Sequence, residues 1–540
     1  MTTQLIHLPD EMLVRILSYL TFDFRLNVMR LVCKRLHDLC QVASLKKVYC
    51  GNLSKCHIHK FIHNGSLRLH SCIVQSIESM NKVFSSHAQV LTNVYLRDVR
   101  FIASSAKLNI DLLKQLKTLR ISNLNENVFH WRSGMGHQLT RLNVQYTSVK
   151  VEDILSLPRI HSLSLSNISN DSLSYLDRFP TLNKLSLISS EDSPLTSFEM
   201  LPQMRQLVHL KVRRGDFVCL KGLNGVINLR ELHLQDCRLQ SFKYFPPLQQ
   251  LTRISIKRGR CYDDCDFHGL EQCPHLRCLE LEYQVEPLSP KIKHTLRESL
   301  PYLPQLTHLT LSSQAYWNDC ESVSNDFGFL KKVPNIINLT CTQFLRDRRN
   351  LQTSCRIPPM LKMKELILMW MSSYNEMFLS RLSVIPNLVV LDVSACKFST
   401  LRRLPPLQHL EVLNVGMADA EYSPLDFSSI AKLPNLQSLT VQAPSLHRVI
   451  GNLPHDLTSL RSLTLFCEST GIITDERWLL SLLRTKVAPN DTHIDVHVQA
   501  YITSEEWGNN PRCHVSYIST LHDSKNIRMS YSLNKCSYLH

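Results

Sequence analysis

The 540-residue sequence contains no long apolar run and only 14 glycines. One of its densest apolar stretches, ELILMWM at 365–371, is far shorter than the roughly 20 residues that a membrane-spanning helix requires. A nucleophile elbow, a glycine-rich phosphate-binding loop and a paired-carboxylate arrangement are also missing. These absences predict a soluble protein that has no catalytic activity of its own, needs no cofactor and has no membrane partner.

The N-terminus, MTTQLIHLPDE, lacks the basic and apolar regions of a secretory signal. The 18 cysteines are scattered through a long chain, which favours reduced thiols over the disulfides of a small secreted scaffold. We therefore expect the protein in the cytoplasm, the nucleus or both. Its net charge of +15 indicates an anionic partner, and the charge alone does not distinguish an acidic protein from nucleic acid or a membrane surface.

One short motif recurs from residue 91 almost to the end of the chain. It consists of an aliphatic residue, two variable residues, an aliphatic, one variable residue and a third aliphatic, as in LVHLKV at 207 and LRELHL at 229. A period of 21 to 30 residues that ends in strand-like alternation is typical of the leucine-rich repeat, in which each unit gives one strand and a return segment. The sixteen copies start at residues 91, 116, 139, 160, 182, 207, 229, 251, 276, 306, 336, 363, 388, 410, 436 and 460.

The motif dictates how its copies pack. The second and third aliphatics lie two residues apart and share one face of a strand, while the residues beside them face the other way. One unit cannot bury three aliphatics alone, so neighbours must stack, and each buried Leu or Val then contributes about 1.5 to 3 kcal/mol. We predict an α/β solenoid at residues 91–466, a leucine-rich-repeat horseshoe with a parallel concave sheet. Seven copies carry a proline that marks the end of the return segment, at Pro158, Pro180, Pro274, Pro304, Pro334, Pro386 and Pro434.

The array is irregular and is flanked by weaker patterns. The strict repeat has Asn or Cys three residues beyond the third aliphatic, and only Cys237 and Cys396 comply. Residues 42–90, with echoes near LKKVYC at 45 and SLRLH at 66, are interpreted as a linker and N-terminal capping repeats. Residues 467–540 are interpreted as a C-terminal cap, in which TDERWLLSLLRTKV is helical and THIDVHVQ is a last strand.

The N-terminal segment has a different pattern. In LPDEMLVRILSYL at 8–20, Leu13, Ile16, Leu17 and Leu20 form one helical stripe, and RLNVMRLVCKRLHDLC after it is also amphipathic. A helical unit of about 35 residues is too small to be self-sufficient, so we expect it to need a partner. LPDEMLVRILSYL followed by LVCKRL resembles the F-box, and an F-box with leucine-rich repeats resembles the F-box/LRR substrate receptors of ubiquitin ligases.

This resemblance implies a small all-helical F-box domain at residues 1–41 that binds a Skp-type adaptor, and through it a cullin scaffold and a RING subunit. It implies a non-catalytic substrate-recognition subunit of an SCF-type ligase, whose repeats bind the protein to be ubiquitinated. The family commonly has Trp where this chain has Leu36. Two alternatives stay open: residues 8–40 could be only a helical cap, and the repeats could be an interaction scaffold without a degradative role. The implied adaptor-binding residues are Leu8, Pro9, Ile16, Leu17, Leu20, Val32, Cys33 and Lys34.

Charge is unevenly distributed over the outward positions of the predicted strands. The last eight copies carry Glu280, Glu282, Glu365 and Asp392 there and no Lys or Arg, whereas Glu231 is the one acid of the first eight. Clustered Arg and Lys form charge-assisted hydrogen bonds to acidic or phosphorylated segments, although exposed charges can also be merely solvated. Nucleic acid is disfavoured because Tyr95 is the one aromatic among these basic positions. The predicted substrate-binding residues are Arg97, Arg120, Arg141, Lys184, Lys211, Arg213, Arg253 and Lys257.

A cysteine- and histidine-rich stretch, CYDDCDFHGLEQCPHLRC at 261–278, has the density of a zinc site. However, Cys273 occupies the entry to a predicted strand and Cys278 lies between two core aliphatics, so the repeat already accounts for them. We predict no metal site. The residues in question are Cys261, Cys265, His268, Cys273, His275 and Cys278.

Overall fold

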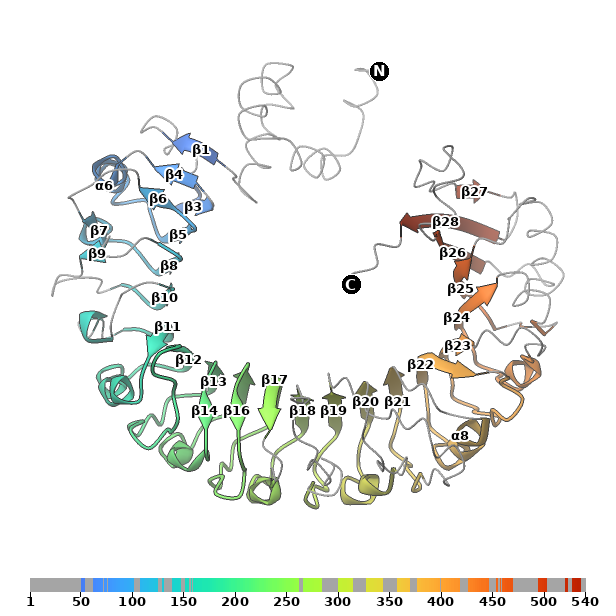
Figure 1. Ribbon diagram of the computed structural model, residues 1–540. Helices are drawn as coiled ribbons and strands as arrows, with labels where there is room; N and C mark the ends of the chain where they lie inside the picture. Colours follow the sequence, from blue (N-terminus) through green and yellow to red (C-terminus); the bar gives the residue numbers. More distant parts are fainter. Residues whose placement is uncertain are drawn as a thin grey trace, which may run out of the picture. The chain divides into compact units, whose positions relative to one another are not determined.

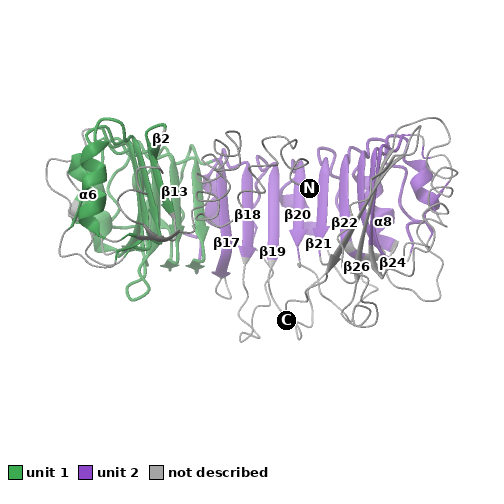
Figure 2. Cartoon of the chain, turned by 90° about the horizontal axis from the view of Figure 1, so that it is seen from above, with its two compact units in different colours: residues 1–239, 244–251 green, residues 240–243, 252–540 purple. Residues whose placement is uncertain are grey.

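The structure is a computed structural model in which the chain divides into two compact units (Figure 2). The first unit contains residues 1–239 and 244–251, and the second contains residues 240–243 and 252–540. The structure describes residues 50–53, 62–70, 72–74, 76–101, 107–124, 129–130, 138–146, 151–154, 157, 159–261, 266–283, 300–313, 327–342, 357–369, 376–398, 400–417, 426–445, 453–454, 457, 459–469, 494–502, 520–522 and 527–535.

The first unit is built on one main parallel sheet (Figure 1). Its neighbouring strands follow the order of the sequence. They are β3 (Ser66–His70), β5 (Asn93–Arg97), β8 (Thr118–Ser122), β10 (Arg141–Gln145), β11 (Ser162–Ile168), β12 (Lys184–Ser189), β13 (His209–Arg213) and β15 (Glu231–Gln235), with β2 (Ile62–His63) antiparallel to β3. Shorter strands pair outside this sheet: β1 (Cys50–Leu53), β4 (Cys72–Val74), β6 (Arg100–Phe101), β7 (Leu108–Asn109), β9 (Phe129–His130), β14 (Asp216–Phe217) and β16 (Arg238–Leu239).

The second unit repeats the same plan. Its parallel strands are β17 (Arg253–Cys261), β18 (Cys278–Tyr283), β19 (His308–Ser313), β20 (Asn338–Thr342), β21 (Glu365–Met369), β22 (Val390–Phe398), β23 (Val412–Met417), β24 (Ser438–Ser445), β25 (Ser462–Ser469), β26 (Ile494–Ile502) and β28 (Ile527–Lys535), and β27 (Thr520–His522) pairs antiparallel with β28. The sequence predicts β26 as the last strand, but β28 follows it and pairs with it in parallel. The β28 sequence, IRMSYSLNK, shows the same alternation as the strands of the repeats.

The sixteen repeat motifs predict the strands correctly. In the described part of the chain, every copy gives a strand that begins two residues after its first aliphatic. These first aliphatics, from Leu91 to Leu460, are at most 4% exposed. Within a strand burial alternates: Leu232 and Leu234 of β15 are in the core, and the residues between and beside them are half-buried on the opposite face. Each unit is thus a stack of leucine-rich repeats held together by shared aliphatic columns.

The return segments are short because a repeat of this length leaves few residues for them. Described residues form helices α6 (Ile77–Ser86), η3 (Ile110–Leu112), η4 (Val151–Ile154), η5 (Asp171–Arg178) and η6 (Lys221–Gly225) in the first unit. The second unit has η7 (His268–Gln272), η8 (Phe327–Lys332), α8 (Glu376–Arg381), η9 (Leu382–Val384) and η10 (Ser428–Lys432). No helix in the described ranges is long and apolar enough to cross a membrane. As predicted, a proline follows two residues after the end of η5, η7, η8, η9 and η10.

In four repeats, side chains at two recurring positions form hydrogen bonds to the preceding repeat. The Cys237 thiol, at the strict-repeat position, donates to the Val212 carbonyl at 3.6 Å, and Cys396 donates to the Leu368 carbonyl at 3.5 Å. Burial raises the pKa of Cys237 to about 11, so the thiol stays protonated. Asparagine amides just before the first aliphatic make a second set of links. Asn228, Asn335, Asn387 and Asn435 donate to carbonyls of the preceding repeat at 2.7 to 2.8 Å.

Behind the first sheet, aromatic residues fill the space between return segments. Phe198 and Phe217 are fully buried and stack with ring centroids 4.6 Å apart. Gly222 of η6 packs against this layer so closely that an added Cβ would lie 2.0 Å from the Phe198 carbonyl carbon. Only a residue without a side chain fits at this position.

We predict that Gly222→Ala destabilises the protein by about 1–3 kcal/mol, because the new methyl must displace backbone in a packed core. Lys221→Ala, in the same helix but exposed, is the matched control and should change stability by less than about 0.5 kcal/mol. Urea unfolding followed by circular dichroism measures both. Equal stability of the two variants would contradict the packing described here.

Candidate interaction surface

The face of each sheet opposite its buried aliphatics, here called the outward face, presents three side chains per strand. In β13 these are His209, Lys211 and Arg213. The parallel register places them in rows with the corresponding residues of neighbouring strands, so that Lys211 lies between Ser186 and His233. Side chains far apart in the sequence are therefore neighbours across the sheet.

The outward face of the first unit is basic, as the sequence predicts. It carries Arg97, Arg120, Arg141, Lys184, Lys211 and Arg213, each exposed or half-buried. Arg97 forms an exposed ion pair with Asp98 at 3.3 Å. Among the residues that the structure describes, no carboxylate forms an ion pair with Arg141, Lys184, Lys211 or Arg213. Within the described ranges, these four cations are therefore not neutralised by an acid of the chain.

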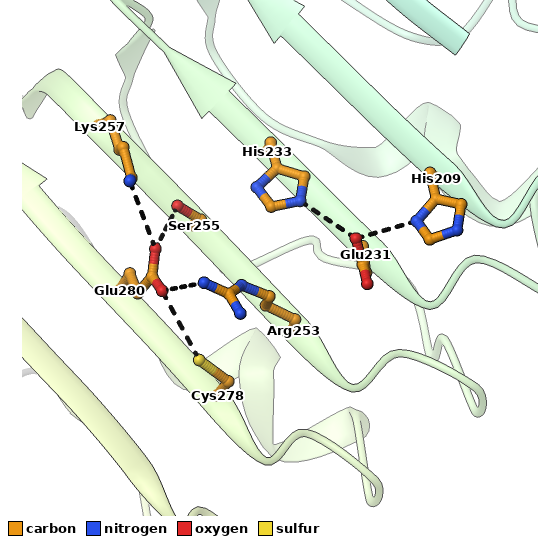
Figure 3. A network of polar contacts seen from close by, with 8 residues as sticks. All are labelled: His209, Glu231, His233, Arg253, Ser255, Lys257, Cys278 and Glu280. Atoms are coloured by element: carbon orange, nitrogen blue, oxygen red, sulfur yellow. Dashed lines mark hydrogen bonds and ion pairs between the residues drawn. The ribbon is translucent and has the colours of Figure 1, made fainter. Parts of the chain in front are cut away.

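The one acid of this face, Glu231, is held by two histidines (Figure 3). His209 Nδ1 lies 2.9 Å from Glu231 Oε2, and His233 Nε2 lies 3.4 Å from the same oxygen. Burial alone would raise the pKa of Glu231, but hydrogen bonds and charge from the two histidines lower it below its usual value. The carboxylate is therefore ionised at neutral pH, and it is already occupied by partners within the face.

In the second unit the predicted cations Arg253 and Lys257 are partly neutralised (Figure 3). Glu280 on the next strand forms an ion pair with the Arg253 guanidinium, lies 4.0 Å from Lys257 Nζ and accepts a 2.7 Å hydrogen bond from Ser255 Oγ. The register places Glu280 directly beside Ser255. The sequence analysis counted Glu280 among the acids of the last eight repeats, apart from the basic residues of the first eight. In the structure Glu280 lies beside Arg253 and Lys257.

The predicted acids further along the second unit also have partners. Asp392 accepts hydrogen bonds from Asn414 at 2.9 Å and from the Ser394 hydroxyl at 2.7 Å, and Glu365 accepts one from Asn338. A cavity of about 530 Å³ lies along the entry to strands β20–β24, and its lining includes Ile337, Lys364, Val389, Glu411 and Gln437. This cavity mixes apolar and charged side chains without a dominant chemistry.

Many of the residues predicted to bind the adaptor or considered for a metal site lie outside the residues that the structure describes. All the adaptor-binding residues, Leu8, Pro9, Ile16, Leu17, Leu20, Val32, Cys33 and Lys34, are outside the described ranges. In the cysteine-rich stretch Cys265 is also outside them, while Cys273 is fully buried and Cys278 contacts Glu280 at 3.9 Å. Within the described ranges, no group of three or more His, Cys, Asp or Glu side chains is arranged to hold a metal ion.

The sequence analysis did not identify one basic residue on the outward face of the first unit, Arg68. Arg68 of β3 lies on the outward face in register with Tyr95 of β5, and its guanidinium carbon is 4.9 Å from the Tyr95 ring centroid. The Arg120 guanidinium of β8 lies 5.3 Å from the same centroid. The sequence SLRLH could have revealed Arg68, because its alternation of apolar and polar residues matches that of the full repeats.

The N-terminal segment matches a known protein family. Residues 5–50 match the family model described as F-box-like. No curated protein matches the chain. The chain therefore combines an F-box-like segment with the leucine-rich repeats that its own strands display.

Three solved structures that resemble this chain share little sequence with it. The Leptospira interrogans LRR protein LIC12759 is 16% identical, with a TM-score of 0.43 over 75% of this chain and 96% of that one. An internalin (inlF) from Listeria monocytogenes str. 4b F2365 is 14% identical, with a TM-score of 0.38 over 67% and 88%. The LRIM1/APL1C complex gives 12% identity and a TM-score of 0.34 over 73% and 64%.

We predict that Glu280→Gln destabilises the protein by about 1–2 kcal/mol, because it leaves the Arg253 guanidinium without its counter-charge. Glu271→Gln, which affects an exposed carboxylate beside His268, is the control and should cost less than about 0.5 kcal/mol. Urea unfolding at low and high salt measures both variants. A Glu280→Gln protein as stable as the control would show that the ion pair does not hold these strands together.

Proposed function

We propose that this chain is the substrate-recognition subunit of an SCF-type ubiquitin ligase. The observation that carries the proposal is the F-box-like match at residues 5–50 in the same chain as long stacks of leucine-rich repeats. In this proposal the N-terminal domain, residues 1–41, binds a Skp-type adaptor and through it a cullin scaffold and a RING subunit. The chain itself is non-catalytic and acts in the cytoplasm, the nucleus or both.

The repeats would bind the protein to be ubiquitinated through the outward face of the first unit. Support comes from the four cations there, Arg141, Lys184, Lys211 and Arg213, that have no acid partner among the described residues. Arginine and lysine groups of this kind make charge-assisted hydrogen bonds to acidic or phosphorylated segments. The alternative is an interaction scaffold that binds a partner without ubiquitin transfer, and adaptor binding separates the two.

The first test removes the proposed adaptor anchor. Leu8→Ala with Pro9→Ala should abolish co-purification with a Skp-type adaptor, because the sequence predicts that the two residues start a helix that needs a partner. The circular dichroism spectrum should be unchanged, since the repeats are stabilised by their own core. Ile227→Ala with Met200→Ala, two exposed apolar residues of the first unit, is the control. If the Leu8/Pro9 variant still recovers the adaptor in full, the ligase proposal is wrong.

The second test reverses charge on the outward faces. Lys211→Glu with Arg213→Glu should eliminate capture of a substrate identified by affinity purification, and should leave adaptor binding intact. Arg253→Glu with Lys257→Glu should have a smaller effect, because Glu280 already offsets these two cations. Lys221→Glu with Arg178→Glu, on return segments, is the control.

Capture should also weaken steeply with salt, since attraction between exposed charges is screened over about 8 Å at physiological ionic strength. Quantitative mass spectrometry of the recovered substrate measures both effects. Capture that survives charge reversal in the first unit and high salt would place recognition elsewhere on the chain.

A further inference from the structure

Three neighbouring strands of the first unit bring two arginines to one tyrosine. Strands β3, β5 and β8 are adjacent and parallel, and their register aligns Arg68, Tyr95 and Arg120 in one row. The two guanidinium carbons lie 4.9 Å and 5.3 Å from the Tyr95 ring centroid. Because the arginines come from the strands on either side of β5, the ring has a cation on each side.

This stacking prepares the arginines for a ligand. A guanidinium that contacts an aromatic ring through its face keeps its N–H edges free to donate hydrogen bonds. Its flexible side chain is also partly fixed before any ligand arrives, which lowers the entropic cost of binding. In the described part of the chain, neither Arg68 nor Arg120 forms an ion pair with a carboxylate. Both arginine side chains therefore lack an anionic partner there.

The same geometry disfavours a nucleic acid base as the ligand. Base binding to a protein surface relies on stacking against an exposed aromatic ring. Here the guanidinium groups of Arg68 and Arg120 occupy the positions over the Tyr95 ring. Tyr95 serves the two cations, and the ligand must be recognised through their N–H groups and the phenolic hydroxyl.

The arrangement suits a phosphoryl group better than a carboxylate. A carboxylate has two oxygens in one plane, and its strongest contact is a bidentate pair with a single guanidinium. A phosphoryl group has three terminal oxygens and a charge of about −1.5 to −2 at neutral pH, so it can accept from donors on several sides. Arg97, two residues beyond Tyr95 on the same outward face, is also exposed, but it already forms an ion pair with Asp98 at 3.3 Å.

We propose that Arg68, Tyr95 and Arg120 form a binding subsite for a phosphorylated side chain of a partner protein. This inference rests on the proposed function and deepens it, because it names the chemistry of the substrate segment and the place where that segment is read. The phosphoryl oxygens accept hydrogen bonds from both guanidiniums and from the Tyr95 hydroxyl.

The test uses the full-length chain and degenerate 11-residue peptides with a central phosphoserine, phosphothreonine or phosphotyrosine. Matched pools carry the unphosphorylated residue or Glu at the centre, and binding is measured by fluorescence anisotropy. At least one phosphorylated pool should bind about tenfold or more tightly than both of its matched pools. Arg68→Gln and Arg120→Gln should each weaken that binding about tenfold, as expected for loss of hydrogen bonds to a charged group.

Tyrosine variants separate the ring from the hydroxyl. Tyr95→Leu removes the stacking platform and should weaken phosphopeptide binding by as much as an arginine variant. Tyr95→Phe keeps the platform and should cost less. Arg178→Gln is the control, because Arg178 is an exposed arginine on the return segment η5. Thermal unfolding of every variant shows that a loss of binding does not reflect a loss of fold.

Three results with the peptides would overturn the proposal: no preference for any phosphorylated pool, unchanged binding in both arginine variants, or equal binding of the Glu pool. The last would make the subsite a carboxylate site. A single-stranded oligonucleotide that binds more tightly than the peptides and depends on Arg68 and Arg120 would also overturn it. Adaptor co-purification is scored separately. A chain that binds phosphopeptides through these residues but not the adaptor contradicts the ligase role alone.

Discussion

No single repeat of this protein can bury its own aliphatic residues, and this constraint determines everything else in the two units. Leu142, for example, is covered by Leu119 on one neighbouring strand and by Leu163 on the other, in strict register. Because the side chains of a strand alternate, fixing this column also fixes which residues face outward. The buried face thus dictates the arrangement of the exposed one, and a partner meets rows of side chains at the spacing between parallel strands.

Those rows decide which charges are free to act. Glu280 lies in the row of Ser255 and is held by Arg253 and Lys257, whereas Lys211 and Arg213 have no such acid beside them among the described residues. Glu231 is close by in the first unit, yet it is bound to His209 and His233. The net charge of the chain is therefore a poor guide to its binding surface, because the row in which a charge sits determines whether it is already satisfied.

The sequence predicts the repeated core well and the surface less well. A motif with its first aliphatic at Leu229 sets the start of strand β15 at Glu231, because strand alternation and burial depend on local spacing alone. The repeat motif did not predict the backbone conformation of the residues that follow the strands. Asp98, Asn123 and Asp236 adopt positive φ there, which Asn and Asp tolerate better than most residues. Arg68 was overlooked although the alternation in SLRLH places it on the outward face, but its contact with Tyr95 depends on which strands are neighbours. The Glu280 ion pair was misassigned for the same reason, because spacing along one strand does not show which side chains meet across two strands.

We propose that the adaptor and the substrate bind to separate parts of the chain, the adaptor to residues 5–50 and the substrate to the outward face of the repeats. Hydrogen–deuterium exchange of the full-length protein, with and without a saturating Skp-type adaptor, tests this separation directly. The adaptor should slow exchange in peptides within residues 5–50 and should leave exchange in strands β5 to β13 unchanged. Adaptor-induced protection in those strands, or none within residues 5–50, would contradict it.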